Sequence, residues 1–338
     1  MSSDMGMRRP LSSLPVCDRL KAVLGEKLHI ATLTAIQTES IPMLLSGRDT
    51  LIQSQTGSGK TLCYLVPLLE QLQAHKTRVG REQGTRALIL LPTRELCTQV
   101  LEVLQQVVAP FHWLVTGSLM GGEKKKAEKA RLRKGVPIVV ATPGRLVDHL
   151  KNTECFTYKH LEWLVLDEAD RLLDLGFEKD LTFVVQKLRA ATRGFQTVLA
   201  SATLTEGVER LAQVSLVDPH RAGYGDKKKG DSIEGSLVGD VEQMVPSTLK
   251  QSYVTVDSRN RLSTLGALLR CKLFCEQRKV LVFLSTCDSV DFHHELFRTF
   301  PVPQELGGAT STPITQLDFP RGMRRLSSVC LRLQVRTA

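Results

Sequence analysis

The sequence predicts an α/β fold, a parallel sheet covered by helices on both faces. Short apolar runs rich in β-branched residues recur between residues 11 and 219, and stretches with apolar residues at helical spacing separate them. This alternation favours a parallel sheet, because two parallel strands need a crossover connection between them. The expected strands are 49–53, 86–91, 138–141, 163–166 and 196–200, and the expected helices include 95–108 and 178–190.

Composition limits the classes of function. The 338 residues suit two domains, and an apolar content of 42% is enough to form buried cores, which excludes a wholly disordered chain. The net charge of +10 suits a polyanionic partner, whereas the 5% aromatic content disfavours a surface that stacks many bases. No apolar run is long enough to span a bilayer, so no membrane partner is expected. The eight scattered cysteines lack zinc spacing and are expected to be reduced thiols.

The pattern divides the chain into five parts. Residues 1–10 are expected to form a flexible N-terminus, and 11–219 the first α/β domain. Gly, Asp, Lys and Ser dominate the next stretch, which predicts a solvated linker over 220–247. A partial second α/β domain is expected over 248–300, followed by an irregular basic tail over 301–338. The elements expected in the partial domain are strands at 250–256 and 279–284 and helices at 261–271 and 289–298.

A glycine-rich loop follows the first expected strand and precedes a helix. It reads Ser54-Gln55-Thr56-Gly57-Ser58-Gly59-Lys60-Thr61. Gly57 and Gly59 let the backbone curl so that several amides point at phosphate. The helix that begins near Lys60 adds its positive dipole end, Lys60 can reach the outer phosphates, and the Thr61 hydroxyl suits Mg²⁺. We interpret this segment as a nucleotide-binding P-loop; the alternative is a loop that only turns the chain.

An apolar strand ends in carboxylates at Asp167, Glu168 and Asp170. Ligands of open α/β sheets gather at the carboxyl ends of strands, so Asp167 is expected to face the same crevice as Lys60. There Asp167 would hold Mg²⁺, largely through water, and Glu168 would orient or polarise an attacking water. The alternative is a helix N-terminus that carries acids because they favour its dipole.

Taken together, these segments resemble the DEAD-box RNA helicases. The motifs that carry the resemblance follow the family's order: Gln37, 55–61, Pro92-Thr93-Arg94-Glu95-Leu96, Gly121-Gly122, Thr142-Pro143-Gly144-Arg145, Asp167-Glu168-Ala169-Asp170 and Ser201-Ala202-Thr203. The resemblance covers roughly residues 11–300 and implies a RecA-like first domain that binds ATP and Mg²⁺. Residues 120–135, 172–181 and 203–219 resemble the nucleolar branch that assembles the large ribosomal subunit. That placement implies pre-ribosomal protein partners and a nuclear, nucleolar location.

The resemblance assigns further parts of the ATP site. Gln37 would read the adenine edge, because a side-chain amide both donates and accepts hydrogen bonds, and Thr34 would support that pocket. Gln55, Thr56, Gly57, Ser58, Gly59, Lys60 and Thr61 would surround the phosphates. Leu11 stands where family members place an aromatic ring over the base, which weakens the expected stacking. The alternative for Gln37 is an ordinary surface helix residue.

The resemblance also places RNA contacts on turns that follow other strands. The expected residues are Thr93, Arg94, Gly121, Gly122, Thr142, Gly144 and Arg145. Glycines permit close backbone approach, and free amides at the start of the helix near Arg145 suit a phosphate. Such contacts touch the nucleic-acid backbone, so binding is expected to be salt-sensitive and largely independent of sequence. The alternative is ordinary turn chemistry and helix capping.

Two further features carry expectations. Ser201 and Thr203 are expected to hydrogen-bond Asp170, and the resemblance gives this contact a role in coupling ATP state to RNA unwinding; the alternative is a cap for the helix near Glu206. Seven basic residues and two acids crowd residues 123–134 on an expected helix. A solvated helix face is the default for such a charge run, and a wider RNA footprint or a nuclear-import patch are the alternatives.

The second domain is expected to be incomplete. Residues 279–286, with Phe283 and Thr286, resemble its first motif, but no His-Arg-x-Gly-Arg or Ala-Arg-Gly-x-Asp run follows. An arginine finger is often worth ~10³ or more in rate, so the chain is expected to bind ATP weakly and turn it over slowly. Three functions are therefore compared: an ATP-dependent RNA helicase, a catalytically impaired RNA- or partner-binding module, and a DNA-directed P-loop ATPase.

Overall fold

The computed structural model describes residues 9–192, 194–223, 252–277 and 280–299. The chain divides into two compact units, Met1–Asp231 and Ser232–Ala338, each of which is described by itself. The boundary between the units falls within the stretch 220–247, which the composition predicts to be a linker. Residues 1–8 of the expected flexible N-terminus 1–10 lie outside the described residues, as does the expected basic tail 301–338, whereas Pro10 forms an isolated antiparallel bridge with Thr32.

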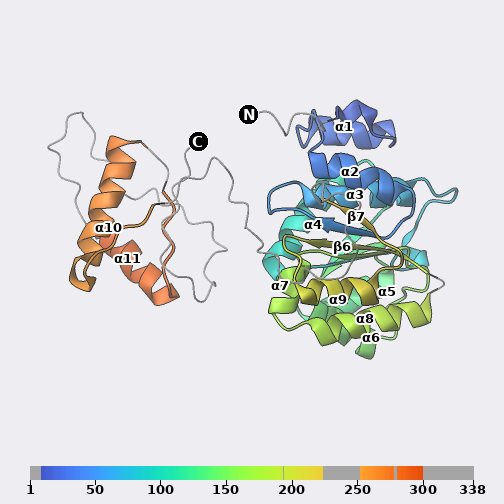
Figure 1. The fold of residues 1–338 in the computed structure, drawn as a ribbon. Helices are drawn as coiled ribbons and strands as arrows, with labels where there is room; N and C mark the ends of the chain where they lie inside the picture. The colour runs from blue at the N-terminus through green and yellow to red at the C-terminus, as the bar shows by residue number, and fades with distance from the viewer. Residues whose placement is uncertain (1–8, 193, 224–251, 278–279, 300–338) are drawn as a thin grey trace, which may run out of the picture. The chain divides into compact units, whose positions relative to one another are not determined.

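The first unit contains a seven-stranded sheet in which every described pair of strands is parallel (Figure 1). The strands are β1 Thr50–Gln53, β2 Ala87–Leu90, β3 Thr116–Leu119, β4 Ile138–Ala141, β5 Trp163–Leu166, β6 Gln196–Ser201 and β7 His220–Ala222. Their order across the sheet is β3-β4-β2-β5-β6-β1-β7. The parallel α/β fold expected from the sequence is confirmed.

Two edge strands escaped the sequence pattern. β3 reads Thr-Gly-Ser-Leu and is largely half-buried, so it lacks the apolar run that marks a central strand. β7 has three residues, His-Arg-Ala, and β1 is its only partner strand in the part of the chain that the structure describes. Because β7 reaches Ala222, the expected linker start at residue 220 is wrong: those residues belong to the sheet.

The described residues of the first unit form nine α-helices. They are α1 Asp18–Glu26, α2 Ala35–Leu45, α3 Lys60–Gln73, α4 Arg94–Val108, α5 Lys125–Lys134, α6 Pro143–Asn152, α7 Ala169–Asp174, α8 Glu178–Ala191 and α9 Glu206–Ser215. Figure 1 shows α2, α3 and α4 on one side of the sheet and α6, α8 and α9 on the other. No helix among the described residues is long and apolar enough to cross a membrane.

Side-chain alternation along the strands builds a separate core on each face. In β2, Ile89 packs with α3 and α4 residues such as Leu65 and Leu104, whereas Leu88 packs on the other face with residues such as Leu146. Successive side chains of a strand point to opposite faces, so a strand buried on both sides reads as a continuous apolar run. Leu11 is buried in the first of these cores.

The second unit has fewer regular elements among its described residues. These are α10 Arg261–Arg270, a π-helical turn Cys271–Cys275 and α11 Cys287–Thr299, which confirm the two expected helices. The expected strands are wrong where the structure describes them, because residues 252–256 and 280–284 are irregular. An extended segment becomes a strand only when a neighbour satisfies its backbone groups, and Tyr253 is 91% exposed.

The parallel sheet brings the carboxyl ends of all its strands to one edge. Along this edge, the segments that follow β3, β4 and β2 lie in one half. The segments that follow β5, β6 and β1 lie in the other half. Gly121 and Gly122, which we call the glycine pair, therefore belong to the first half of the edge, together with Thr142 and Thr93. Asp167, Ser201 and the P-loop belong to the other half.

Candidate nucleotide and nucleic-acid sites

The P-loop curls between β1 and α3 with two glycines in the left-handed region. Gly57 has φ 82° and Gly59 has φ 90°. A Cβ on Gly59 would lie 2.5 Å from the side-chain nitrogen of Gln37, so a side chain at this position would displace Gln37. The loop therefore requires glycine both for its backbone angle and for its contact with α2.

Lys60 is buried, with 6% of the residue exposed, at the start of α3. Its Nζ donates a hydrogen bond to the Ser54 carbonyl oxygen at 2.5 Å and lies 3.9 Å from Glu168 Oε1. The ammonium thus sits inside the loop that it would use to bind phosphates, facing the acidic end of β5. This geometry brings together the two ends of the expected site, which are far apart in the sequence.

Gln37 joins α2 to the P-loop. Its Oε1 accepts from the Thr34 backbone N–H at 3.0 Å, and its Nε2 donates to the Gly59 carbonyl at 3.1 Å. Thr34 is the N-cap of α2, and the two residues form a capping box. Gln37 is only 4% exposed, so its interpretation as a surface residue is wrong. A primary amide has two N–H groups and two acceptor lone pairs, which leaves one of each for a further partner.

Asp167 is a buried carboxylate at the end of β5. The Tyr64 hydroxyl donates to its Oδ2 at 2.8 Å, and the Glu168 backbone N–H donates to its Oδ1 at 2.9 Å. Burial raises the pKa of Asp167 to about 6, helped by the neighbouring charge of Glu168 and opposed by the Tyr64 hydrogen bond and by Lys60. Tyr64 was missed by the sequence analysis, because an aromatic residue inside an apolar helix is typical of a core.

Glu168 has an unusual backbone. Its φ of 53° places a non-glycine residue in the left-handed region, a conformation that is costly and concentrates at functional sites. Although it stands at the N-cap of α7, its side chain makes no capping hydrogen bond there and faces Lys60 instead. Its Oε2 is buried with no hydrogen-bond partner and lies 3.7 Å from the Arg171 Nε. Helix-dipole chemistry alone does not explain this arrangement.

The residues of this half fit a magnesium-bound nucleoside triphosphate. The hydroxyl oxygen of Ser58 is buried in the loop and has no hydrogen-bond partner among the described residues, which suits a ligand that offers one. Asp167 supplies carboxylate oxygens and Thr61 a hydroxyl in the first turn of α3, the oxygen donors that Mg²⁺ prefers. Thr56 and Gly57 are exposed, so a ligand can reach the loop.

Asp170 connects the end of β5 to the end of β6. Its Oδ2 accepts from the Thr203 backbone N–H at 3.0 Å and from the Thr203 hydroxyl at 2.8 Å. The Ser201 hydroxyl accepts from the Asp170 backbone N–H at 3.3 Å and donates to the Thr203 carbonyl at 2.7 Å. The N-cap of α9 is Thr205, so the alternative that Ser201 or Thr203 caps this helix is wrong.

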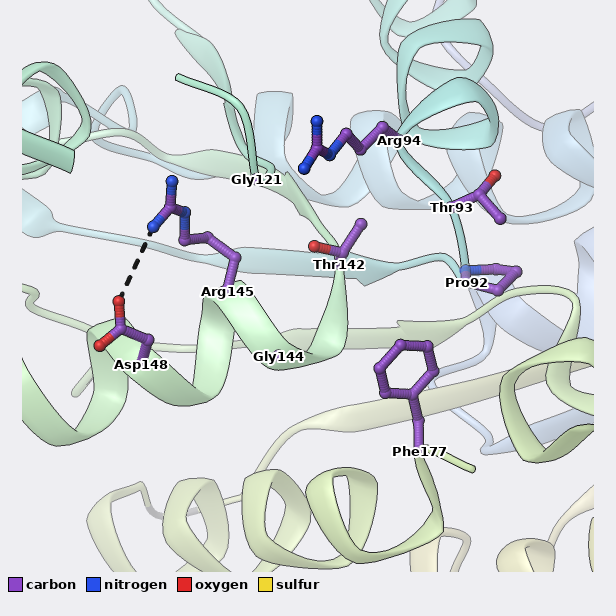
Figure 2. Close-up of a pocket in the computed structure, with 9 residues that line it drawn as sticks. All are labelled: Pro92, Thr93, Arg94, Gly121, Thr142, Gly144, Arg145, Asp148 and Phe177. Atoms are coloured by element: carbon purple, nitrogen blue, oxygen red, sulfur yellow. Dashed lines mark ion pairs between the residues drawn. The ribbon is translucent and has the colours of Figure 1, made fainter. Parts of the chain in front are cut away.

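A cavity of about 520 Å³ opens at the other half of the edge (Figure 2). It is lined by Pro92, Thr93, Arg94, Gly121, Thr142, Gly144, Arg145, Asp148 and Phe177. Of the residues expected to contact RNA, only Gly122 is absent from this lining, and it directly follows Gly121. The Phe177 ring points into the cavity and is a lining residue that the sequence analysis missed.

Arg94 is an exposed cation that lies over the glycine pair. A Cβ on Gly121 would lie 2.8 Å from one guanidinium nitrogen of Arg94, and a Cβ on Gly122 would lie 2.6 Å from the other. Within the part of the chain that the structure describes, no carboxylate forms an ion pair with Arg94. Its charge is therefore directed at the cavity and its surroundings.

Ordinary helix capping was the alternative to RNA contact for these turns, and it is observed at Thr93. The Thr93 hydroxyl accepts from the Leu96 backbone N–H at 3.3 Å and so caps α4. Thr142 precedes α6 but makes no capping hydrogen bond with its side chain. Figure 2 shows the Thr142 side chain at the cavity between Arg145 and Pro92.

The basic run forms α5, as expected, but it is not simply a solvated face. Lys124, Lys126, Arg133 and Lys134 are exposed, whereas Glu128 is completely buried. Glu128 and the buried Leu132 are four residues apart and share one face of the helix. The interpretation of Glu128 as part of a solvated face is therefore wrong.

Two solved structures are similar to this fold. The chain superimposes with a TM-score of 0.59 on Mss116p bound to ssRNA and AMP-PNP, at 28% identity, covering 65% of this chain and 46% of that one. It matches the yeast DEAD-box splicing factor Prp28 with a TM-score of 0.60, at 26% identity, covering 88% of this chain and 66% of that one.

Curated relatives align over most of this chain. The human protein named ATP-dependent DNA helicase DDX31 is 47% identical over 82% of this chain, and this alignment covers 34% of the human protein. DEAD-box ATP-dependent RNA helicase 17 of rice is 42% identical over 93% of this chain and 57% of the rice protein. ATP-dependent RNA helicase dbp7 of Aspergillus fumigatus is 41% identical over 89% of this chain and 43% of the fungal protein.

The chain thus spans between about a third and three fifths of the length of these relatives. The family description "DEAD/DEAH box helicase" matches residues 34–211, which include the P-loop, the cavity-lining turns and the acidic end of β5. The chain belongs to the DEAD/DEAH box helicase family.

Proposed function

We propose that this chain provides the ATP-binding and RNA-gripping part of an ATP-dependent RNA helicase. RNA-stimulated ATP hydrolysis would drive local duplex unwinding or remodelling of a ribonucleoprotein. One observation carries the proposal: a single sheet edge holds a buried Lys60–Glu168–Asp167 cluster in one half and a cavity with the exposed cation Arg94 in the other. We assign this role to a domain over residues 11–222, since β7 ends at Ala222.

In the nucleotide half, each residue has a defined task. The P-loop amides, Ser58 and Lys60 would bind the phosphates, and Thr61 and Asp167 would hold Mg²⁺, largely through water. When bound there, the metal would supply positive charge that stabilises the phosphate oxygens. Glu168, held at the strained N-cap of α7, orients the attacking water and accepts its proton. Gln37 uses its remaining N–H and lone pair to recognise adenine.

In the RNA half, the groups available are suited to the sugar–phosphate backbone. Arg94 supplies positive charge, Gly121 and Gly122 allow close approach, and the exposed Gly144 lies in the first turn of α6. Glycine backbones and a helix N-terminus contact phosphates and sugars rather than base edges. Binding should therefore be almost independent of base sequence and should weaken steeply with salt.

From the resemblance, we further propose that Asp170, Ser201 and Thr203, all in the nucleotide half, couple ATP state to RNA affinity. They join the segment after β5, which carries Asp167, to the segment after β6, which lies between β5 and β1 in the sheet. A shift of the acidic segment when nucleotide binds would therefore be transmitted through these hydrogen bonds. Coupling of this kind appears as a change in RNA affinity with nucleotide state.

The relatives support RNA as the substrate and suggest a biological setting. The rice and Aspergillus relatives carry RNA helicase in their names, and the solved Mss116p complex contains ssRNA and an ATP analogue. From the resemblance of residues 120–135, 172–181 and 203–219 to the nucleolar branch, we further propose pre-ribosomal RNA and proteins as partners, and the nucleolus as the location.

DNA is the second candidate substrate, because the human and Dictyostelium relatives are named ATP-dependent DNA helicases. The two substrates differ in the 2′-hydroxyl and in strand geometry, which a backbone grip senses directly. Competition between RNA and DNA oligonucleotides of the same sequence separates them. Stronger competition by DNA would overturn the assignment to RNA.

The decisive experiment is steady-state ATP hydrolysis with and without RNA. The chain should be compared with a version extended by the remainder of the rice relative, and Lys60→Ala and Glu168→Gln serve as controls. We expect RNA-stimulated hydrolysis in the extended protein that both substitutions abolish. Binding of RNA and ATP without stimulated hydrolysis in either protein would favour a binding module instead. Absence of RNA binding would refute the proposal.

A further inference from the structure

A buried polar cluster lies directly behind the RNA cavity. Glu128 of α5 is fully buried, and so is His149 of α6. His149 Nε2 lies 3.0 Å from Glu128 Oε2, and its Nδ1 lies 3.0 Å from the Thr153 hydroxyl. Arg145 Nε is also 3.0 Å from Glu128 Oε2, an ion pair whose N–H is not aligned as a hydrogen bond. We call Glu128, Arg145 and His149 the α5–α6 cluster.

The α5–α6 cluster holds the glycine turn from both sides. Glu128 Oε1 accepts from the backbone N–H of Met120, the residue before Gly121, at 3.2 Å. Arg145 donates from a terminal nitrogen to the backbone carbonyl of Glu123, the residue after Gly122, at 3.0 Å. The two contacts flank the turn, and Glu128 and Arg145 are themselves paired. Glycine backbones are otherwise among the most mobile, so this turn gains a fixed geometry.

The two arginines of the cavity therefore differ in kind. Arg94 is exposed and has no ion-pair partner among the described residues. The Arg145 side chain is 19% exposed and has Glu128, the Glu123 carbonyl and, at 3.9 Å, Asp148 as partners. Figure 2 shows it directed toward Asp148 rather than toward Arg94. Arg145 keeps unused N–H donors, but its positive charge is compensated by the fully buried Glu128, so it attracts a phosphate less than the uncompensated Arg94 does.

We propose that Glu128 and Arg145 are positioning residues, which hold the Gly121–Gly122 turn so that Arg94 and the turn itself can grip RNA. The phosphate charge is met mainly by Arg94. This inference rests on the proposed RNA-binding function and adds a division of labour within it. It replaces the expectation that Arg145 acts as a direct RNA contact.

A simpler account treats the Glu128–Arg145 pair as packing that happens to lie near the cavity. A different account treats Glu128 as an anion that withholds Arg145 from RNA. The three accounts predict different signs: substituting Glu128 would weaken RNA binding, leave it unchanged or strengthen it. Lysine at position 145 also separates them, because lysine keeps the charge but lacks the planar fork that reaches several acceptors.

The test uses the full chain and a fluorescent single-stranded oligouridylate, with RNA affinity measured over a range of salt concentrations. We expect Glu128→Gln and Arg145→Lys each to weaken RNA binding about 10-fold with an unchanged salt slope, because no phosphate contact charge is removed. Arg94→Gln should weaken binding and lower the slope by about 1, whereas Arg94→Lys should retain most affinity. Affinity for a fluorescent nucleotide should be unchanged in the Glu128 and Arg145 variants.

The double variant Glu128→Gln with Arg145→Met guards against misfolding, since it removes both charges of a buried pair together. It should melt at the same temperature as the wild type yet bind RNA as weakly as either single variant. The losses should not add, because both substitutions remove the same support of the Gly121–Gly122 turn. Normal RNA affinity in Arg145→Lys, or unchanged or tighter binding in Glu128→Gln, would overturn the inference while leaving RNA binding by the wild type intact. Failure of the wild type to bind RNA would refute the proposed function and this inference with it.

Discussion

The two halves of the sheet edge treat charge in opposite ways. In the nucleotide half, Lys60 and Asp167 are buried and already engaged by protein groups, the Ser54 carbonyl and the Tyr64 hydroxyl. In the RNA half, Arg94 is exposed and lies over the Gly121–Gly122 turn, which the buried Glu128 and the partly buried Arg145 hold. A ligand of the first half must exchange existing contacts for new ones, whereas a ligand of the second half meets a prepared surface.

This difference has consequences for binding. In the nucleotide half, loss of one residue should strongly weaken nucleotide binding, because a buried polar group left without its partner costs free energy. Backbone contacts in an open cavity are more numerous and individually weaker, so loss of one reduces RNA affinity by less. The predictions below separate the two halves by this criterion.

Lys60→Ala should have the largest effect. Removal of a buried ammonium aimed at the phosphates should weaken ATP binding or lower hydrolysis by ~10²–10³-fold. RNA affinity without nucleotide should change little, because Lys60 lies in the other half of the edge. Fluorescent-nucleotide and RNA titrations measure the two effects separately. Lys187→Ala, on the exposed side of α8, is the matched control. If Lys60→Ala reduced RNA affinity as much as ATP affinity, the two halves would not be separate sites.

Asp167→Asn should stabilise the chain in EDTA while removing its Mg²⁺ ligand. Because burial raises the pKa of Asp167 to about 6 from an ordinary 3.8, protonation contributes stability that is full below pH 3.8 and lost as pH rises through 6. Asparagine is neutral throughout, so its advantage should reach up to about 3 kcal/mol at pH 8 and fade toward pH 4. Thermal melting at both pH values measures it. Asp174→Asn, on the exposed side of α7, should show no such gain.

Thr203→Val should weaken the coupling of RNA affinity to nucleotide state without removing a proposed phosphate or RNA contact. Valine keeps the shape of threonine but removes the hydroxyl that donates to Asp170 Oδ2. RNA affinity with and without an ATP analogue should then differ by about 2-fold, against a typical coupling of ~5–150-fold in an intact allosteric protein. Thr182→Val, which removes a hydroxyl bonded only within α8, provides the control. Coupling as strong as in the wild type would exclude this route.

Gly122→Ala should have the smallest effect, confined to RNA. An added Cβ would meet an Arg94 guanidinium nitrogen at 2.6 Å, in a backbone with φ 104°. Arg94 must move, so RNA affinity should fall by about 3- to 5-fold, within the range of one backbone contact. Gly47→Ala shares the positive φ, 82°, but its Cβ meets nothing within 4 Å. If both variants lost RNA affinity equally, general strain rather than Arg94 would be the cause.

Residues at strand ends were the most predictable part of the molecule. Their chemistry is local: glycines before a Lys-Thr pair, acids after an apolar run, and turns that follow each strand mark themselves in the sequence. Because parallel strands share one carboxyl edge, the expectation that Lys60 meets the acidic end of β5 followed from the pattern alone. The order of strands along that edge did not follow, since it depends on which crossover each helix makes.

Glu128 shows why the rest was not predicted. A glutamate among lysines predicts a solvated face, and only its spacing from Leu132 hinted that it turns inward. What buries it is contact with Arg145 and His149 of α6, residues that the sequence places in another element. The same holds for Tyr64, whose role is set by Asp167 across the fold. In the second unit, strands were expected where no neighbour pairs with the described residues, because propensity cannot supply a partner.

Amide hydrogen exchange with each ligand alone tests the central division of the sheet edge most directly. The account predicts that Mg²⁺ with AMP-PNP protects residues 34–37 and 54–61, and that single-stranded RNA alone protects residues 93–97, 120–124 and 142–146. RNA that protected the P-loop while leaving the glycine turn and the start of α6 unchanged would contradict it.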